Sequence, residues 1–483
     1  MWKLNRKTAD SLLALALLAC ALQSGCAVNP ATGRPEVVLM SEQGEIDLGR
    51  KTHQEILKQL PVYNDQDLQA YVNEVGQKLA REGDRPELDY TFTVIDSPDV
   101  NAFALPGGYI YINRGLMAYM QTEAQLAAVL GHEIAHVTAR HGVRQHRNSM
   151  LANVAAVAVA IGTGVGAAGD VAGIAGQAAI SGYGRGMELE ADRLGAAYMA
   201  KAGYDHEQML EVLGILKDQQ QYAAARAKAQ GRQGGSYHGV FASHPENDQR
   251  LQEVVRAANS LTRGPDPVVG RDRFLRQVNG MVYGDSPEQG VSRGDSFYHG
   301  GLGFTFSHPP EWSLENQAQA VILIAPGGQA VIQLTALPQP QDKSPAQTLA
   351  AQNIRGLSRP VAREVNGLRA AQARLSGGGH VALVYHGTQA YALLGRPAES
   401  AADTDMTDAF NSVLGSFRQL TPADANKALA HRIALWQARP GWNYDRLARL
   451  SPLGGDAQAQ LRLLNQDYPD EEPAAGETLK IVE

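Results

Sequence analysis

Cysteine is scarce in this sequence, with two residues in a chain of 483. Both of them, Cys20 and Cys26, lie near the start of the chain, so no pair remains further along to form a disulfide. The folded part must therefore be stabilised by its apolar core and by any metal that it binds.

Positive charge is also limited. The chain has 43 Lys and Arg against 50 Asp and Glu, and a net charge of −7 at pH 7. A chain without a basic excess is poorly suited to a phosphate backbone, so we exclude nucleic acid as a partner. The apolar fraction of 44% is that of a globular protein. At roughly 150 residues per domain, the length predicts two to four domains.

The first 25 residues are typical of a secretory signal peptide. A basic start precedes an apolar run at 12–22 that is too short to span a bilayer. Cys26 follows Ser24-Gly25, which resembles a bacterial lipobox, and the Pro- and Gly-containing sequence after it suits a tether. We predict lipidation at Cys26, with simple secretion and a competing site at Cys20 left open. The absence of Asp directly after Cys26 resembles outer-membrane sorting, so we expect an anchor in that membrane, facing the periplasm.

Helical spacing of apolar residues predicts two amphipathic helices, at 41–60 and 67–83. Residues 88–117 instead alternate between apolar and polar. We therefore expect strands around 90–94 and 109–112, joined at Pro106-Gly107-Gly108.

A third helix should carry the motif HEIAH. Thr122 and Gln125 form a capping-box signature, and Gly142 is a plausible stop. Residues four apart on a helix lie about 40° from each other, so His132 and His136 can reach one metal ion together. Glu133 then flanks the ion, where it can take a proton from the attacking water. This pattern predicts a catalytic zinc site with one Zn²⁺ per chain, although a polar helix face gives the same spacing.

Two histidines alone make a weak site, so a third ligand is needed. His141 follows His136 by five residues, about 140° round a continuous helix, and should point away. In GMELEADRLGAAYM, Glu188 and Asp192 share one helix face and Glu190 lies on another. We assign Glu188 as the third metal ligand and Asp192 as a carboxylate that orients one histidine.

HEIAH, ELEAD and SHPENDQRL together resemble the zinc metallopeptidases related to HtpX and the CAAX prenyl proteases. Within this gluzincin family, the opening of the mature chain is similar to the periplasmic lipoprotein branch that includes BepA and LoiP. The resemblance covers about 26–260 and implies endopeptidase activity in a mainly helical domain with a small β-sheet. Membrane-bound relatives carry transmembrane segments where this chain has the Gly- and Ala-rich stretch 148–183. That stretch is either a loop beside the active site or a membrane hairpin. A tetratricopeptide tail like that of BepA is absent.

The resemblance also suggests further site residues. His244 would lie near the zinc, where it could hydrogen-bond the oxyanion, ligate the open position in a latent state, or simply form a turn before Pro245. Arg250 is a weaker candidate for the same pocket. The NAFALPGG segment borders the cleft in the family, so Asn101 and Ala104 are possible substrate contacts, unless the segment is a plain hairpin. The strand GGYIYIN could offer its edge to an extended substrate.

The remaining chain divides by composition and pattern. We predict an α+β fold overall, with a signal peptide, a metallopeptidase domain, a linker, an α+β domain resembling PsbP or Mog, and a small module resembling LysM. Their expected bounds are 1–25, 26–262, 263–296, 297–420 and 421–483. A LysM-like module would suggest contact with peptidoglycan.

These patterns favour a lipid-anchored zinc endopeptidase that cleaves misfolded or unassembled envelope proteins. Glu133 would take and return the proton, and His244 would steady the oxyanion. The alternative is an envelope scaffold or chaperone lipoprotein with a structural or latent zinc site.

Overall fold

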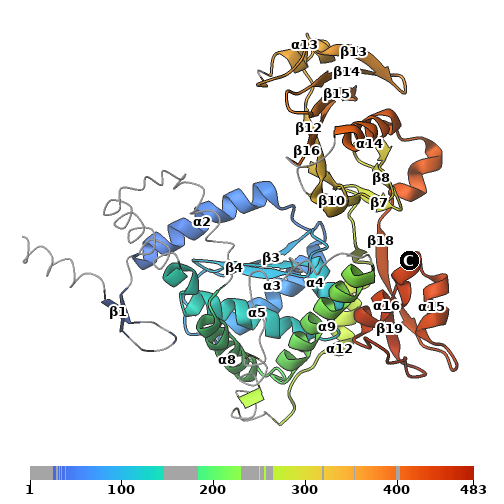
Figure 1. Ribbon diagram of the computed structural model, residues 1–483. Helices are drawn as coiled ribbons and strands as arrows, with labels where there is room; N and C mark the ends of the chain where they lie inside the picture. The colour runs from blue at the N-terminus through green and yellow to red at the C-terminus, as the bar shows by residue number, and fades with distance from the viewer. Residues whose placement is uncertain are drawn as a thin grey trace, which may run out of the picture. The chain divides into compact units, whose positions relative to one another are not determined.

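The computed structural model describes residues 40–145, 183–229, 265–317, 320–352, 354–398 and 403–483, with short stretches between 26 and 37 and between 250 and 261. The chain forms two compact units (Figure 1). Unit 1 comprises Met1–Lys58, Val62–Asn279 and Leu435–Ile481. Unit 2 comprises Gln59–Pro61, Gly280–Ala434 and Val482–Glu483. Among the described residues, no helix has the length and apolar character needed to cross a membrane.

Unit 1 begins with a two-stranded ribbon, β1 (Cys26–Val28) and β2 (Pro35–Val37), followed by helices α2 (Glu42–Gln59) and α3 (Gln66–Ala80). The two predicted amphipathic helices are confirmed. The side chain of Asp65 caps α3 by accepting a hydrogen bond from the backbone N–H of Leu68, which satisfies one of the unpaired donors at the helix start.

A three-stranded sheet follows, and its pairing differs from the expected one. The strands are β3 (Thr91–Ile95), β4 (Ala102–Leu105) and β5 (Tyr109–Asn113), in the order β3-β5-β4. β3 pairs with β5 in parallel, so the turn at Gly107 and Gly108 joins β4 to β5 and does not join the two predicted strands. Both glycines have positive φ, which few other residues adopt at low cost. The strand GGYIYIN is thus central, and β4 lies at the sheet edge.

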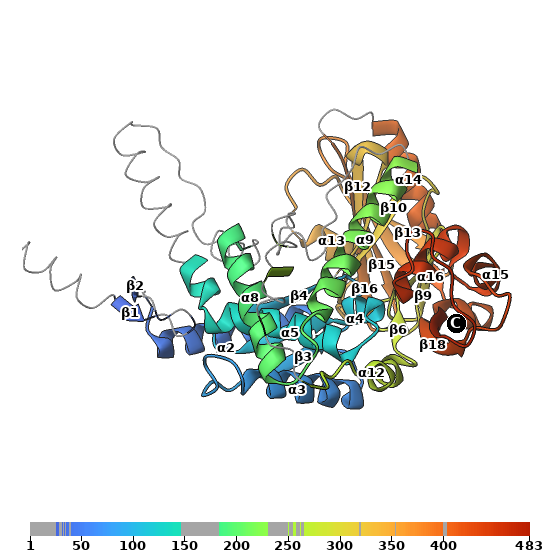
Figure 2. The ribbon, with the colours of Figure 1, turned by 90° about the horizontal axis from the view of Figure 1, so that it is seen from below.

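The centre of unit 1 is α5 (Glu123–Thr138), every residue of which is buried. The predicted cap is present, because the Thr122 side chain accepts from the backbone N–H of Gln125. The Gln125 side chain, however, accepts from the backbone N–H of Gln121, so the reciprocal half of the capping box is shifted by one residue. α5 packs against α3, α9 and the edge strand β4, and lies beside α8 (Figure 2). The other helices are α4 (Arg114–Tyr119), α8 (Arg185–Lys201), α9 (Gln208–Ala229) and α12 (Arg271–Val278).

Helix α12 corrects the prediction of a linker at 263–296. Its residues Phe274, Leu275 and Val278 are buried, and the helix contacts α3 and α5. The polar and Gly-rich residues around it suggested a linker, but three apolar residues at helical spacing are enough to hold this short helix on the core.

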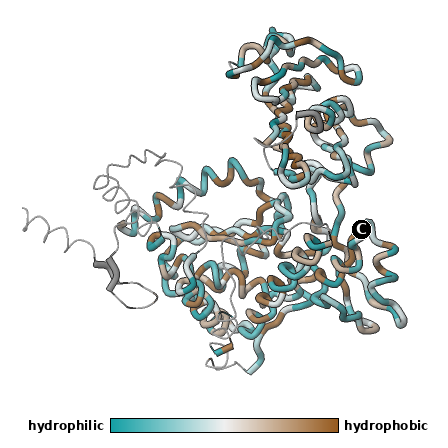
Figure 3. Tube along the Cα trace, viewed as in Figure 1, coloured by the Kyte–Doolittle hydropathy of each residue, from teal (hydrophilic) through white to brown (hydrophobic). Residues whose placement is uncertain are grey.

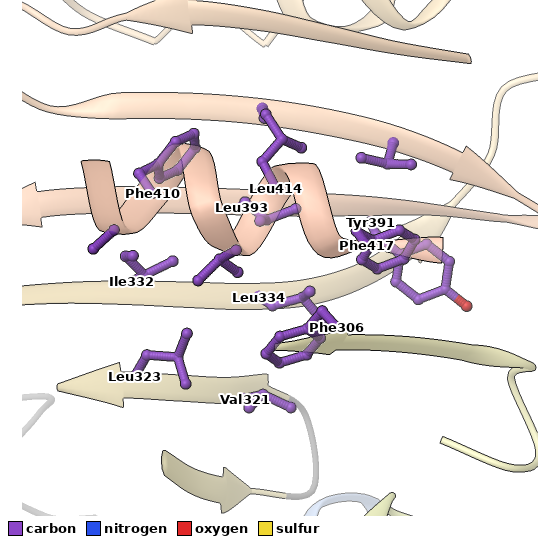
Figure 4. Packing of buried hydrophobic residues seen from close by; sticks show 14 of the residues in the cluster. Phe306, Val321, Leu323, Ile332, Leu334, Tyr391, Leu393, Phe410, Leu414 and Phe417 are labelled. Carbon is purple, nitrogen blue, oxygen red and sulfur yellow. The ribbon is translucent and has the colours of Figure 1, made fainter. Parts of the chain in front are cut away.

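Unit 2 is built on an antiparallel sheet of seven strands, in the order β10-β11-β12-β16-β15-β14-β13. Along β12 buried and exposed residues alternate, and the trace of the sheet alternates accordingly between hydrophobic and hydrophilic (Figure 3). Phe410 and Leu414 of the closing helix α14 pack onto Leu393 and Ile332 of the strands (Figure 4). The strands are β10 (Ser313–Gln317), β11 (Ala320–Ile324), β12 (Ala330–Pro338), β13 (Val361–Val365), β14 (Leu368–Arg374), β15 (His380–His386) and β16 (Gln389–Pro397).

A smaller sheet completes unit 2, in the order β17-β9-β8-β7. The described chain is therefore α+β, as predicted. The remaining elements of this part are η1 (Pro326–Gly328), α13 (Pro345–Ala350), α14 (Asp403–Ser416), η2 (Pro422–Ala428), β6 (Val282–Tyr283), β7 (Val291–Arg293), β8 (Ser296–His299), β9 (Phe304–Ser307) and β17 (Arg418–Gln419).

The last segment runs through β18 (His431–Gln437), α15 (Tyr444–Leu450), η3 (Gly454–Asp456), α16 (Ala457–Asn465) and β19 (Thr478–Val482). Residues 435–481 of this segment are part of unit 1. The ammonium of the fully buried Lys480 donates hydrogen bonds to the backbone carbonyls of Ala118 and Met120 at the end of α4. The Gln121 side chain donates to the carbonyl of Leu464 at 2.7 Å. The segment is therefore fixed to the chain just before α5.

Candidate metal centre

Three predicted metal ligands come together in unit 1. His132 and His136 of α5 place their Nε2 atoms 2.9 Å apart. Glu188 of α8 lies 3.5 Å from each of these nitrogens through its two carboxylate oxygens. All three side chains are buried.

Close packing of two helices makes this arrangement possible. α5 and α8 meet at Gly131 and Gly195, and a Cβ atom on Gly195 would lie 2.9 Å from the backbone nitrogen of His132. A larger residue at either position would push the helices apart. The two glycines therefore let Glu188 reach the histidines.

The donor set fits a zinc ion. Ligand atoms at about 2.0–2.1 Å from a tetrahedral zinc lie about 3.3 Å from one another. The observed separations of 2.9 and 3.5 Å bracket this value. Two imidazoles and one carboxylate, with a fourth position open, are the ligands of hydrolytic zinc sites.

Asp192 and Arg250 make polar contacts with the ligands His132 and Glu188. Asp192 Oδ1 lies 2.9 Å from His132 Nδ1, so it can orient the ring as predicted. Arg250 donates two hydrogen bonds to Asp192, at 2.8 and 2.9 Å, and its third nitrogen lies 3.1 Å from Glu188. Arg250 thus compensates part of the negative charge of the two carboxylates that face His132.

The electrostatics of the site favour positive charge. Burial alone would lower the pKa of His132, but the hydrogen bonds with Asp192 and Glu188 outweigh it and raise this pKa to about 10. Burial likewise opposes ionisation of Asp192, yet Arg250 and His132 keep its pKa below the usual value. A metal cation can take the place of this proton, since a ligating imidazole must be neutral.

Glu133 lies beside the ligands and is buried. It lines a cavity together with His132 and Ala102 of the edge strand β4. The other walls are mainly apolar side chains of α4, α5 and α9: Leu116, Ala128, Val129, Met209, Val212, Leu213 and Leu216. A carboxylate next to the ligands thus faces a pocket that suits an apolar group.

His141 does not point away from the metal ligands, which corrects the expectation from the sequence. Its Nδ1 lies 2.8 Å from Nδ1 of His136, and its Nε2 lies 3.1 Å from Glu190. The expectation assumed a helix continuing to Gly142, but α5 ends at Thr138 and Arg140 has a φ of 55°. This left-handed residue turns the next helical turn back toward His136.

Glu190 and Tyr183 are two further residues that sequence reasoning missed. Burial opposes the charge on Glu190, but hydrogen bonds from His141 and Arg144 lower its pKa to about 2. The Tyr183 ring stacks on His136 with their centroids 4.0 Å apart. HEIAH-x4-H spacing could have pointed to His141, but no local signal marks Tyr183.

The predicted substrate contacts lie on or next to β4. The backbone carbonyl of Asn101 accepts a hydrogen bond from Asn113 N, and Ala104 lines a second small cavity that includes His136 and Tyr183. Ala102 between them lines the cavity beside Glu133. The roles of Asn101 and Ala104 stay predictions.

Three sequence predictions cannot be placed at the site. His244 and most of 148–183 lie outside the described residues. Cys26 is the first residue of β1, and its lipidation stays a prediction.

The centre combines two buried histidines one helical turn apart with a glutamate between them. A carboxylate from a second helix supplies the third ligand. This combination is typical of a metallopeptidase centre. Peptidase family M48 matches residues 66–258. This match confirms the resemblance to zinc metallopeptidases noted in the sequence.

Curated relatives cover the same region. The putative beta-barrel assembly-enhancing protease of Vibrio cholerae serotype O1 is 38% identical over 173 residues, 34% of this chain and 36% of the relative. The beta-barrel assembly-enhancing protease of Escherichia coli K12 is 28% identical over 228 residues, 45% of this chain and 44% of the relative. The mitochondrial metalloendopeptidase OMA1 of Schizosaccharomyces pombe is 30% identical over 149 residues, 31% of this chain and 43% of the relative. The chain thus spans less than half the length of each of these three proteins.

A comparison with solved structures gives a weak match. The solution structure of cyanobacterial PsbP from Synechocystis sp. PCC 6803 covers 27% of this chain and 95% of its own, with 16% sequence identity and a TM-score of 0.21. A likeness at this level supports no conclusion, so the PsbP- or Mog-like and LysM-like architectures stay predictions.

Proposed function

We propose that this protein is a zinc-dependent metalloendopeptidase of the bacterial cell envelope. The observation that carries the proposal is the buried group of His132, His136 and Glu188, with Glu133 beside it at the wall of an apolar cavity. A structural metal site needs no carboxylate next to its ligands, whereas peptide hydrolysis needs a general base there.

The residues of the site suit each part of the reaction. Zinc, when bound by His132, His136 and Glu188, supplies Lewis-acid polarisation of the scissile carbonyl and lowers the pKa of water to about 7. Glu133 takes the proton of the attacking water and returns it to the leaving amine. His244 remains our candidate donor to the oxyanion, on the strength of the family resemblance alone.

The edge strand β4 offers a binding surface for an extended peptide. β4 lies next to α5 and ends the sheet order, so a substrate strand could add to the sheet alongside the metal centre. Main-chain pairing accepts varied sequences, and the apolar cavity at Ala102 would hold one apolar substrate side chain. Both features favour unfolded polypeptides, because folded proteins seldom present an extended apolar segment.

We propose misfolded or unassembled envelope proteins as the substrates. The two bacterial relatives reported above are named for β-barrel assembly, which points to the same class of substrate. A lipid anchor at Cys26 would hold the enzyme at the outer membrane, on the periplasmic side.

A second surface favours contact with peptidoglycan. The carboxy-terminal segment has the element order β18-α15-α16-β19. A shallow cavity there is lined by Trp436, Arg439 and Gly476 among others, and Trp442 lies 4.6 Å from Trp436 between ring centroids. Aromatic faces offer apolar area with a polar rim, which suits sugar rings.

Sedimentation with insoluble peptidoglycan tests this second surface. We expect Trp436→Ala to reduce the bound fraction, while Leu450→Ala, at an exposed apolar residue of the same segment, leaves it unchanged. Equal binding of both variants would remove the glycan proposal and leave the peptidase proposal intact.

The peptidase proposal is tested by measuring zinc content and proteolysis together. The chain from Cys26 onward and its Glu133→Gln variant are compared for bound zinc and for cleavage of casein and of an unfolded porin. We expect one zinc per chain in both proteins and a loss of about 10²–10⁴-fold or more in the rate for the variant. Glu82→Gln, an exposed glutamate beyond the end of α3, serves as the control and should cleave like wild type.

Two outcomes would contradict the mechanism. Equal rates with and without Glu133 would remove the assigned base. Zinc-loaded wild type that cleaves neither substrate would favour the envelope scaffold or chaperone with a structural metal.

A further inference from the structure

The two histidines of the metal centre are held in different ways. His132 contacts a carboxylate directly, with Nδ1 2.9 Å from Asp192. His136 instead contacts a second imidazole, that of His141, at 2.8 Å between their Nδ1 atoms. His141 in turn contacts Glu190 at 3.1 Å, and Arg144 donates to the same carboxylate oxygen at 2.9 Å.

A left-handed turn in the backbone brings His141 next to His136. Arg140 adopts a left-handed conformation, with a φ of 55°, directly after the end of α5. Its side chain is fixed by Glu45 at 2.7 Å and by the carbonyl of Met40 at 3.1 Å. The turn that follows is therefore anchored to the amino-terminal part of unit 1, and it carries His141 into a fully buried position.

Hydrogen bonding then defines one proton arrangement. A neutral imidazole has one N–H and one acceptor nitrogen. If Nε2 of His136 ligates a metal, the one proton of the neutral His136 ring must be on its Nδ1. This N–H then donates to Nδ1 of His141. The proton of His141 must then sit on Nε2, from which it donates to Glu190. Arg144 keeps Glu190 an acceptor by pairing with it.

We propose that His141 is a positioning residue that holds His136 in its metal-ligating tautomer and orientation, with Glu190 and Arg144 fixing the proton of His141. Groups that hydrogen-bond the far nitrogen of a metal-ligating histidine usually contribute 10–100-fold to metal affinity. The proposal rests on the proposed zinc site, and it assigns to His136 the support that Asp192 gives to His132.

Two substitutions separate this role from space filling. In Asn the side-chain Oδ1 occupies the place of the histidine Nδ1, so His141→Asn keeps an acceptor for His136. His141→Leu fills a similar volume without an acceptor. A purely structural His141 would be replaced better by Leu, whereas a positioning His141 would be replaced better by Asn.

The experiment measures metal binding, not only activity. Zinc affinity of the chain from Cys26 onward is determined by competition with a chromophoric chelator, and the Co²⁺-loaded protein is examined by visible absorption. We expect a loss of about 10–100-fold in zinc affinity and an altered Co²⁺ spectrum for His141→Leu. His141→Asn should stay within a few-fold of wild type. Asp192→Leu, which removes the acceptor of His132, is the positive control, and His386→Leu in unit 2 is the matched control that should change neither zinc affinity nor the Co²⁺ spectrum.

Several results would overturn the proposal. Wild-type affinity and spectrum in a folded His141→Leu protein, or equal deficits in the Asn and Leu variants, would show that the acceptor is irrelevant. If His141→Leu does not fold, Glu190→Leu removes the partner of His141 instead, and unchanged zinc affinity in that variant would contradict the relay. Wild type that binds no zinc at all would refute the proposed function itself, which separates the two failures.

Discussion

Units 1 and 2 bury different kinds of side chain. Unit 1 holds oppositely charged pairs out of contact with water, such as Arg85 with Glu45 at 2.8 Å and Arg114 with Asp96 at 2.6 Å. Among the described residues of unit 2, Asp424 is the only fully charged side chain that is buried. The core of unit 2 consists instead of aromatic and aliphatic residues around Phe410.

Buried ion pairs and apolar packing contribute differently to the positions of side chains and to the free energy of folding. A buried ion pair often contributes no more free energy of folding than apolar residues of the same size, because both charges must leave water. Apolar packing stabilises unit 2 more simply. In unit 1, Glu45 also holds the Arg140 turn that precedes His141. We infer that unit 1 keeps its buried charges for the position they give to neighbouring groups.

The largest effect should come from breaking the charge network of unit 1. Glu45→Gln leaves both Arg85 and Arg140 without their buried anion, so we expect a loss of about 3–5 kcal/mol in the free energy of unfolding. Denaturant titration followed by zinc release measures it. Glu42→Gln is the control, because Glu42 contacts the same Arg85 but is 57% exposed, and it should cost less than about 1 kcal/mol. Similar effects of the two changes would show that burial does not set the strength of this network.

A somewhat smaller effect is expected from the core of unit 2. Phe410→Ala removes a fully buried ring and should destabilise unit 2 by about 3–4 kcal/mol. Casein cleavage and zinc content at low temperature should stay unchanged, because no residue of the metal centre belongs to unit 2. Val361→Ala, at a residue that is 67% exposed, is the control for unfolding. Loss of bound zinc in Phe410→Ala would argue against this independence.

The smallest effect concerns pH and contrasts two histidines. Carboxylates raise the pKa of His132, whereas burial lowers the pKa of His299 in unit 2 from 6.5 to about 4. The unfolded chain then binds more protons at His299 than the folded chain does between pH 6.5 and 4. Stability must therefore fall as the pH is lowered through this window and level off below it.

The His299 contribution amounts to about 2 kcal/mol between pH 7.5 and pH 5, at about 1.36 kcal/mol per pKa unit. His299 Nδ1 accepts a hydrogen bond from the backbone N–H of Leu302 at 3.2 Å. The variant His299→Asn keeps an acceptor for this N–H but has no group that titrates. The difference in unfolding free energy between the two proteins, measured at both pH values, isolates this group. A difference that does not change with pH would show that His299 keeps its ordinary pKa in the folded protein.

Local patterns predicted most of the metal centre. The cap at Thr122, the spacing of His132 and His136, and the shared face of Glu188 and Asp192 all follow from helix geometry along short stretches. These predictions held because each depends on residues fewer than five positions apart.

Contacts between distant segments could not be read in the same way. The turn at Arg140 depends on Glu45 and Met40, about a hundred positions earlier in the chain, so the sequence around His141 looked like continuing helix. The parallel pairing of β3 with β5 and the place of α12 on the core have the same origin. In each case a partner far along the chain decided between conformations that were locally similar.

The hydrogen bonds of Lys480 have a consequence for the order in which unit 1 can fold. Ribosomes make the chain from the amino-terminal end, so Lys480 emerges after every residue of the metal centre and after all of 280–434. Until then the carbonyls at the end of α4, just ahead of α5, lack the ammonium that they accept from in the finished fold. We expect unit 1 to stay incomplete until the segment 435–481 has joined it.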